Sequence, residues 1–202
     1  MTTRLKIFTL AAFSLLLAGS IHTKAQIVLS PSFSPDRDKS LVEIGRIGQD
    51  AESNSEHTHI TSGYFLYAKI FPDRIVYTIT CESRDNARAV MEIALGTTFD
   101  GLKASLDTML DWLHNTTSGE SIGFTDIEGR QFQLVREIFG FRVLELSGNA
   151  SINGSCIFTG QQLANAKYKL NKNAARKIQA RIASLGLTDS PSAEEFRDSS
   201  CR

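Results

Sequence analysis

Neither sign of charge dominates this chain of 202 residues, which has 22 lysines and arginines and 22 aspartates and glutamates. That balance gives no electrostatic argument for a nucleic-acid partner, and we expect none. Cysteine is scarce, since three residues are too few for a small disulfide-stapled scaffold. Because 42% of the residues are hydrophobic and 22% are charged, the composition is that of a folded domain with a sizeable core. Collagen-like and low-complexity classes are excluded.

Recognisable reactive motifs are absent from the sequence. It has no Walker loop, no Gly-x-Gly-x-x-Gly fingerprint, no EF-hand loop and no Gly-x-Ser-x-Gly elbow. His57 and His59 can share one side of an extended segment, but no closed set of metal ligands accompanies them. We therefore predict no metal site, no cofactor and no motif-defined catalytic residue, which favours a protein that is not an enzyme.

A small secreted hydrolase is the alternative interpretation, with a site assembled in three dimensions around His114. Asp111 and His114 are three residues apart on a predicted helix, so they are neighbours on its surface. Ser118 or Ser121 would complete a nucleophile, base and acid set. Such a set is recognised by geometry and not by spacing, so the sequence leaves this alternative open.

The N-terminus has the pattern of a secretory signal peptide. Arg4 and Lys6 precede a short apolar run over residues 7–18. A membrane-spanning helix needs about 20 apolar residues, and polar residues end this run too early. Small residues permit cleavage before Gln26, which we favour, or before Ile21. The prediction is a secreted or periplasmic protein with no transmembrane segment in the mature chain.

Composition divides the chain into four predicted segments. They are a signal peptide (1–25), a flexible N-terminal arm with an edge strand (26–59), a single α+β domain (60–187) and a polar C-terminal tail (188–202). Pro31 and Pro35, among serines and charged residues, indicate the arm, and the segment 41–47 is its predicted edge strand.

Segments rich in aromatic and β-branched residues predict strands in the α+β domain. The predicted strands are 64–70, 74–81, 87–95, 122–126, 131–138, 141–146 and a short last strand at 155–158. Pro72 and Asp73 supply a turn between the first two, which form a hairpin. In the second strand, alternate residues from Ile75 to Cys81 form the predicted core face.

Two amphipathic helices are predicted, one starting at Thr98 and one over residues 159–185. The second starts with the capping-box pair Thr159 and Gln162 and ends at Gly186. Short connections favour antiparallel strands, and each apolar helix face needs a surface to cover. The predicted fold is α+β: one antiparallel sheet of about six strands, with two amphipathic helices packed on one face.

The cysteines allow three single disulfides, each of which leaves one thiol over. We favour Cys81 with Cys156, because both lie at strand ends with alternating apolar neighbours, and this leaves Cys201 in the tail. The alternative is that Cys81 and Cys156 are reduced and act as small buried hydrophobic residues.

Positive charge is concentrated in the predicted second helix. Between residues 159 and 185 the sequence has Lys167, Lys169, Lys172, Arg176, Lys177 and Arg181 and no acidic residue. We favour the interpretation that this helix lies on the acidic remainder of its own chain. The alternative is a polyanion-binding face formed by Lys169, Lys172 and Arg176, which point away from the apolar stripe.

No segment of the sequence resembles a known family closely enough to name one. An export signal joined to a domain without a recognisable reactive set favours a binding or interaction module. Its expected partner is an unidentified protein or glycan.

Overall fold

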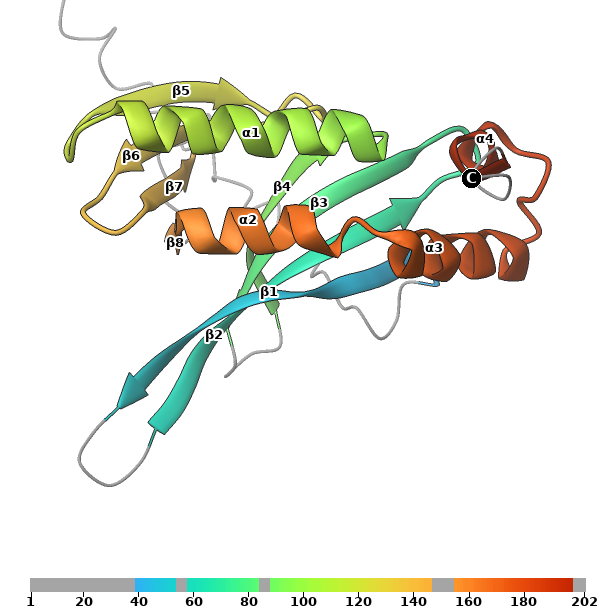
Figure 1. Ribbon diagram of the computed structural model, residues 1–202, viewed down its shortest axis with the longest axis horizontal. Helices are drawn as coiled ribbons and strands as arrows, with labels where there is room; N and C mark the ends of the chain where they lie inside the picture. The colour runs from blue at the N-terminus through green and yellow to red at the C-terminus, as the bar shows by residue number, and fades with distance from the viewer. Residues whose placement is uncertain (1–38, 54–57, 84–87, 147–154, 198–202) are drawn as a thin grey trace, which may run out of the picture. The chain divides into compact units, whose positions relative to one another are not determined.

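A computed structural model describes residues 39–53, 58–83, 88–146 and 155–197 (Figure 1). The predicted signal peptide, residues 26–38 of the predicted arm, His57 and Cys201 lie outside these residues. In the described part of the chain, no helix is both long enough and apolar enough to cross a membrane.

Within the described residues, eight strands form two antiparallel four-stranded sheets, with the orders β1-β2-β3-β4 and β5-β6-β7-β8. The strands are β1 (Leu41–Ser53), β2 (Thr58–Ile70), β3 (Ile75–Ser83), β4 (Arg88–Gly96), β5 (Ser121–Thr125), β6 (Gln131–Arg136), β7 (Phe141–Glu145) and β8 (Ser155–Phe158). The predicted α+β class with antiparallel strands is confirmed. The prediction of one sheet of about six strands is wrong.

The turn between β5 and β6 explains why the sheets are separate. Ile127 N donates to Ala94 O at 3.1 Å, and Ala94 N donates to Asp126 Oδ2 at 3.2 Å. These bonds use the backbone N–H and C=O of Ala94 on the free edge of β4. β8 contacts β4, but the two strands are not joined by a ladder of hydrogen bonds. The second meander therefore continues beside the first without pairing with it.

The helix α1 (Phe99–Asn115) follows β4 and is positioned by its cap and its apolar face. Thr98 Oγ1 accepts a hydrogen bond from Gly101 N, which satisfies one free backbone donor of the first turn. The predicted apolar stripe is buried at Leu102, Leu106, Met109 and Leu113. Figure 1 shows α1 in front of the second sheet. The ring of Trp112 meets that of Phe141 of β7 edge-on, with centroids 6.1 Å apart.

The predicted long helix over residues 159–185 is two helices, α2 (Gly160–Lys169) and α3 (Lys172–Ser184). Leu170 leaves the helical conformation, and the side chain of Asn171 then accepts hydrogen bonds from Asn173 N and Ala174 N. An asparagine that caps a new helix in this way ends the preceding one. The apolar spacing continues across the break, which is why the sequence pattern reads as a single helix.

The capping box predicted at the start of α2 is present. Gln162 N donates to Thr159 Oγ1, and Thr159 N donates to Gln162 Oε1. α2 packs on β1 and β2 and lies beside α1. The inner faces of both sheets and the apolar faces of α1, α2 and α3 share one hydrophobic core, which includes the face of β3 from Ile75 to Cys81.

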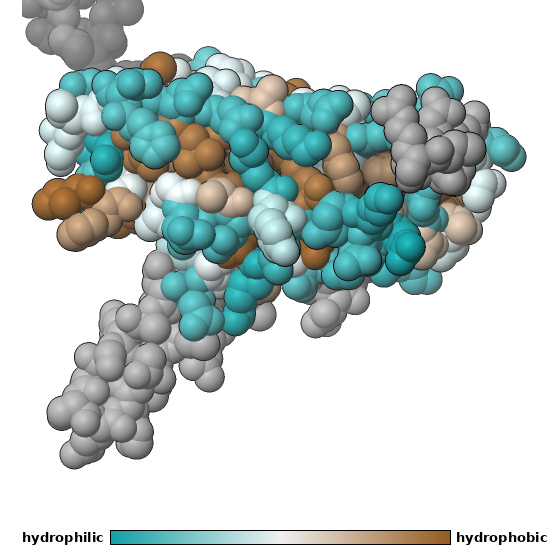
Figure 2. All heavy atoms as spheres, viewed as in Figure 1, coloured by the Kyte–Doolittle hydropathy of each residue, from teal (hydrophilic) through white to brown (hydrophobic). Residues whose placement is uncertain are grey.

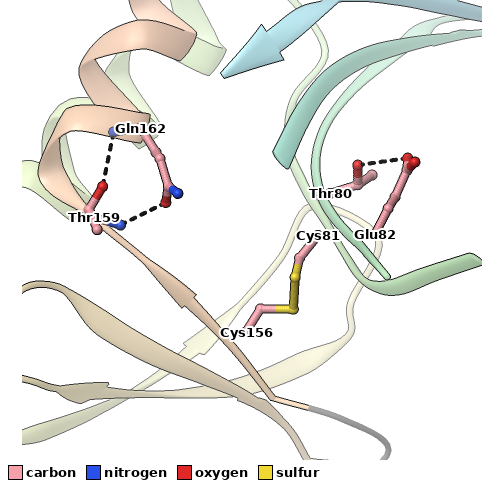
Figure 3. The surroundings of a disulfide bond; sticks show 6 residues. All are labelled: Thr80, Cys81, Glu82, Cys156, Thr159 and Gln162. Atoms are coloured by element: carbon pink, nitrogen blue, oxygen red, sulfur yellow. Dashed lines mark hydrogen bonds between the residues drawn. A yellow bond between two sulfur atoms is a disulfide. The ribbon is translucent and has the colours of Figure 1, made fainter. Parts of the chain in front are cut away.

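A disulfide joins the two sheets (Figure 3). Cys81 lies in β3 and Cys156 in β8, with their Cα atoms 6.3 Å apart. Both residues are buried, at 3% exposure each. The bond is the pairing favoured from the sequence, and it links two sheets that share no hydrogen-bonded ladder.

The chain after α3 packs back onto the core. The 3-10 helix η1 (Pro191–Ala193) and the short helix α4 (Glu194–Arg197) follow it. Phe196 is buried, and its ring meets that of Phe99 edge-on, with centroids 5.6 Å apart. Part of the segment predicted as a polar tail therefore contributes to the apolar interior.

Glu195 anchors this C-terminal segment through both carboxylate oxygens. Oε1 accepts from Phe99 N, at the start of α1, at 2.5 Å, and Oε2 accepts from the Tyr77 hydroxyl at 3.0 Å. Burial raises the pKa of Glu195 above its ordinary value, although both hydrogen bonds act in the opposite direction. Burial also raises the pKa of Tyr77, so its hydroxyl remains a donor.

This arrangement predicts that acidification stabilises the fold. A carboxyl with a raised pKa holds its proton more tightly in the folded chain, so stability rises as pH falls from above the folded pKa towards the ordinary value of 4.5. Glu195→Gln keeps one acceptor for Phe99 N and removes this titration. We expect its free energy of unfolding, measured by urea titration between pH 7 and pH 5, to depend less on pH than that of the unsubstituted chain.

The matched control is Glu194→Gln, because Glu194 is exposed and directly precedes Glu195. It should leave the pH dependence unchanged. Burial also raises the pKa values of Glu82 and Glu92, so some acid stabilisation should persist in Glu195→Gln. An unchanged pH slope in Glu195→Gln would show that this carboxyl does not couple docking of the segment to pH.

Candidate functional site

His114, the centre of the hydrolase alternative, is exposed in the last turn of α1. Within the described residues it makes no hydrogen bond to Asp111, Ser118 or Ser121. The Ser121 hydroxyl instead accepts from Gln133 Nε2 at 3.2 Å. The same part of the chain holds no cluster of three or more His, Cys, Asp or Glu side chains that could bind a metal ion.

Several basic side chains of α2 and α3 bond other parts of the protein, among them Lys167, Lys177 and Arg181. Lys167 forms an ion pair with Asp107 of α1. Lys177 Nζ donates to Glu43 O and Ile44 O of β1, both at 3.3 Å, and Arg181 donates to Lys39 O at 2.9 Å. These cations hold α2 and α3 against neighbouring elements.

The proposed polyanion residues lie at the junction of the two helices. Lys169 ends α2 and is half-buried, with its Cδ 3.3 Å from where a Cβ of Gly45 would lie. Lys172 and Arg176 are exposed on α3. Figure 2 shows hydrophilic colour over α3. The three residues are thus close in sequence, at the end of α2 and on α3, and no described pocket is lined by all three.

An open groove of about 570 Å³ lies nearby, between β1 and α3. Its lining residues are Val42, Glu43, Lys177, Ala180, Arg181 and Ser184. Both cations in the lining already bond backbone carbonyls at β1 or before it. The groove is therefore a weak candidate for binding an anion, because its cations would exchange existing partners for the ligand.

Two half-buried carboxyl groups, those of Glu82 and Glu92, lie on the face of the first sheet opposite the core. Glu82 Oε1 accepts from the Tyr67 hydroxyl at 2.9 Å and from Thr80 Oγ1 at 3.2 Å (Figure 3). Burial raises the pKa of Glu82 and of Glu92, and the nearby Arg130 partly opposes this for Glu92. These groups form a hydrogen-bonded polar face on a sheet, without a described cleft that would hold a substrate.

Exposed apolar side chains gather on the second sheet. Six of the seven large apolar side chains exposed among the described residues belong to it or to its turns: Ile122, Ile127, Ile138, Phe139, Leu146 and Ile157. Figure 2 shows hydrophobic colour at the end of the view where Figure 1 places the turn between β6 and β7. Ile122 pairs with Leu134 and lies on the core face of this sheet, whereas Ile157 pairs with Arg142 and lies on the opposite face. The turn between β6 and β7, which has the two most exposed of these side chains, is therefore the candidate interaction surface.

The most exposed members form the tip of the β6–β7 hairpin. Ile138 is 72% exposed and Phe139 is 86% exposed. The sequence pattern extends the strand to Ile138, whereas β6 ends at Arg136, so this boundary prediction is wrong. Glu137 N donates to Gly140 O at 2.9 Å and closes the turn. The two apolar residues are therefore at the tip because the turn begins two residues earlier than expected.

Arg136 holds the tip from inside. Its guanidinium donates to Glu137 O and, at 2.8 Å, to Gly140 O, the two carbonyls at the base of the turn. Its Nε also donates to Leu113 O at the end of α1, at 3.1 Å. The half-buried Arg136 side chain thus bonds both ends of the turn and joins the turn to the adjacent helix.

Two further contacts fix the tip. Arg142 of β7 pairs with Glu137 at 2.9 Å across the base of the hairpin. A Cβ at Gly140 would lie 2.2 Å from Phe158 O, so only glycine permits the close approach of β8 here. The apolar pair is presented on a turn with a defined backbone, which lowers the ordering cost of binding.

Comparisons with known proteins give no family for this chain. No protein-family model matches it, and no curated protein sequence matches it.

Sequence reasoning missed the hairpin tip because Ile138 and Phe139 continue an apolar strand pattern. The available signal was the sequence Glu137-Ile138-Phe139-Gly140, in which an apolar pair lies between a charged residue and a glycine.

Proposed function

We propose that this chain is an exported, non-enzymatic binding module that docks on a protein partner through Ile138 and Phe139. The single observation that carries the proposal is an apolar pair that is 72% and 86% exposed on a turn fixed by Arg136 and Gly140. Exposing Phe to water brings no benefit to a monomer, whereas an aromatic anchor that fills a pocket is a frequent hot spot of interfaces.

Export is the second part of the proposal. The basic start, the short apolar run and the small residues before Gln26 support cleavage there and a place of action outside the cytoplasm. The disulfide between Cys81 and Cys156 agrees with an oxidising compartment. Material collected from the exporting cell should begin at Gln26.

The double variant Ile138→Ser, Phe139→Ser tests the proposal. Both side chains are exposed, so we expect the free energy of unfolding to change by less than about 0.5 kcal/mol. The protein in native extracts of the exported fraction should shift from a partner-bound size to its free size on size-exclusion chromatography. Loss of a hot-spot aromatic costs about 2 kcal/mol or more, a fall in affinity of about thirtyfold.

Tyr168→Ser is the matched control, because Tyr168 is 81% exposed but belongs to α2 and not to the second sheet. It should remain bound to the partner. The proposal fails if the double variant stays in the bound fraction, or if Tyr168→Ser is released equally.

A further inference from the structure

β5 is the outer strand of the second sheet, and its hydrogen bonds to β6 follow a strict alternation. Arg136 N donates to Glu120 O at 2.7 Å, and Asp126 N donates to Arg130 O at 2.9 Å. Hydrogen-bonded pairs alternate with non-bonded pairs along an antiparallel ladder. The register that joins these two pairs therefore directs the backbone groups of the even-numbered residues of β5 towards β6.

The odd-numbered residues of β5 direct their backbone groups away from the sheet. They are Ser121, Gly123 and Thr125, and all three are exposed. In the part of the chain that the structure describes, their N–H and C=O groups have no hydrogen-bond partner. A Cβ at Gly123 would have no atom within 4 Å, so the space beside the strand is open there.

The two edges of the first sheet differ from that of β5, because side chains or a turn bond their backbone groups. Along β1, Asn165 Nδ2 donates to Ile47 O at 2.9 Å, and Lys177 reaches two further carbonyls. At β4, the turn through Asp126 and Ile127 bonds Ala94 on both its N–H and its C=O. Natural sheets block edges in this way, or with charge, proline or a bulge, to avoid pairing with another chain.

β5 has none of those protections. Its sequence is Ser-Ile-Gly-Phe-Thr, with no charged residue and no proline, and its register to β6 is free of bulges. Ile122 is 45% exposed, and the ring of Phe124 stacks on that of Phe132 with centroids 5.4 Å apart. An open, uncharged edge with apolar side chains is a template for an added strand.

The sequence of β5 has a hydroxyl residue at each end and an apolar residue on each side of Gly123, so its pattern of residue types is the same in both directions. In an antiparallel pair of two copies centred on Gly123, Ile122 lies opposite Phe124 of the second copy, and Ser121 lies opposite Thr125. Pairs of aromatic with β-branched residues, and of Ser with Thr, are favourable across antiparallel strands. The outward-facing residues 121, 123 and 125 meet as hydrogen-bonded pairs, so every open backbone group of the strand gains a partner.

We propose that β5 is a self-association strand: two copies of this chain pair β5 with β5 about a two-fold axis at Gly123 and join their second sheets into one continuous sheet. Such an interface is isologous, which is the commonest form of closed dimer. The occupant is a second copy, because the strand is complementary to itself in side chains, backbone groups and absence of charge. Phe139 lies on a different turn, so this proposal does not rest on the binding function of the hairpin tip.

Charge at Gly123 tests the proposal. Gly123→Lys and Gly123→Glu each bring like charges face to face across the two-fold axis, while the open space leaves the monomer fold intact. Sedimentation velocity over a concentration series should show a dimer for the unsubstituted protein. We expect each variant alone to weaken dimerisation at least about tenfold, since juxtaposed like charges cost several kcal/mol. An equimolar mixture of the two variants should recover the dimer.

The control is Ala183→Lys, which adds the same charge at an exposed position of α3 and should dimerise normally. Urea titration of each variant checks that the monomer remains folded. The proposal is overturned if the unsubstituted protein is a monomer throughout, if either charged variant dimerises unchanged, or if the mixture does not recover the dimer. Binding of an extended peptide from another protein at β5, with no dimer, would equally overturn it.

Discussion

Replacing Asp126 with Asn is expected to cost about 3 kcal/mol of folding stability, the lower end of the range for removing one member of a buried ion pair. The carboxylate of Asp126 is completely buried. It accepts hydrogen bonds from Glu128 N, Arg130 N and Ala94 N and pairs with the Arg130 guanidinium at 2.8 Å. We expect the lower end of this range because the Arg130 side chain is 30% exposed, so water still solvates its charge when Asp126 is replaced.

The amide of Asn can keep the acceptor that closes the turn, but its NH₂ group then faces Ala94 N and the guanidinium, which are both donors. The variant thus tests the attachment of the second sheet to β4 more than the turn itself. Urea titration gives the loss directly. Glu128→Gln is the control, because the Glu128 carboxylate is 3.5 Å from the Arg130 guanidinium and both side chains are about one third exposed. This variant should lower the free energy of unfolding by less than about 0.5 kcal/mol. Equal stability of the two variants would contradict this account of the turn.

Removing the disulfide is expected to have the second large effect. The bond between Cys81 and Cys156 closes a loop with a sequence separation of 75 residues. Without the bond the unfolded chain gains the conformational entropy that the closed loop denies it. We therefore expect reduction, or the double variant Cys81→Ala, Cys156→Ala, to lower the free energy of unfolding by about 4 kcal/mol. Because the two sheets share no ladder, the bond also holds β8 against β3.

Urea titration with and without a reductant measures this cost, and Cys201→Ser is the control that should leave it unchanged. Thiol titration of the denatured, non-reduced protein should give one free thiol per chain. Three free thiols would contradict the bridge, and so would equal stability of the oxidised and reduced protein.

Much of the local structure can be predicted from the sequence because short-range physics decides it. Alternation over residues 75–81 predicts the buried face of β3, and Pro72 with Asp73 predicts its hairpin turn. The Thr159 and Gln162 capping box and the stripe from Leu102 to Leu113 also follow from local spacing. Each of these features depends on neighbours within a few residues.

The features that failed depend on contacts between distant residues. The division into two sheets depends on Asp126 and Ile127 reaching Ala94, more than thirty residues away in sequence. The break between α2 and α3 is set by Asn171, whose capping role competes with a continuous apolar stripe. The end of β6 depends on Arg136 bonding Leu113 O of α1. Periodicity contains no information on such distances.

The candidate surface was hidden from sequence reasoning for the same reason. Ile138 and Phe139 have the composition of a core strand, and only the position of the turn makes them exposed. Among the basic residues of α2 and α3, Lys167 pairs with Asp107, whereas Lys177 and Arg181 donate to backbone carbonyls. That the helices complement an acidic remainder of the chain stays a prediction.

Site-specific photo-crosslinking in cells that produce the protein tests the central claim most directly. A benzophenone amino acid replaces Phe139 in one sample and Tyr168, which is similarly exposed on α2, in another. The account predicts a discrete protein adduct at position 139 that is lost with Ile138→Ser, and no such adduct at position 168. Equal adducts at both positions, or none at position 139, would contradict a binding role for the hairpin tip.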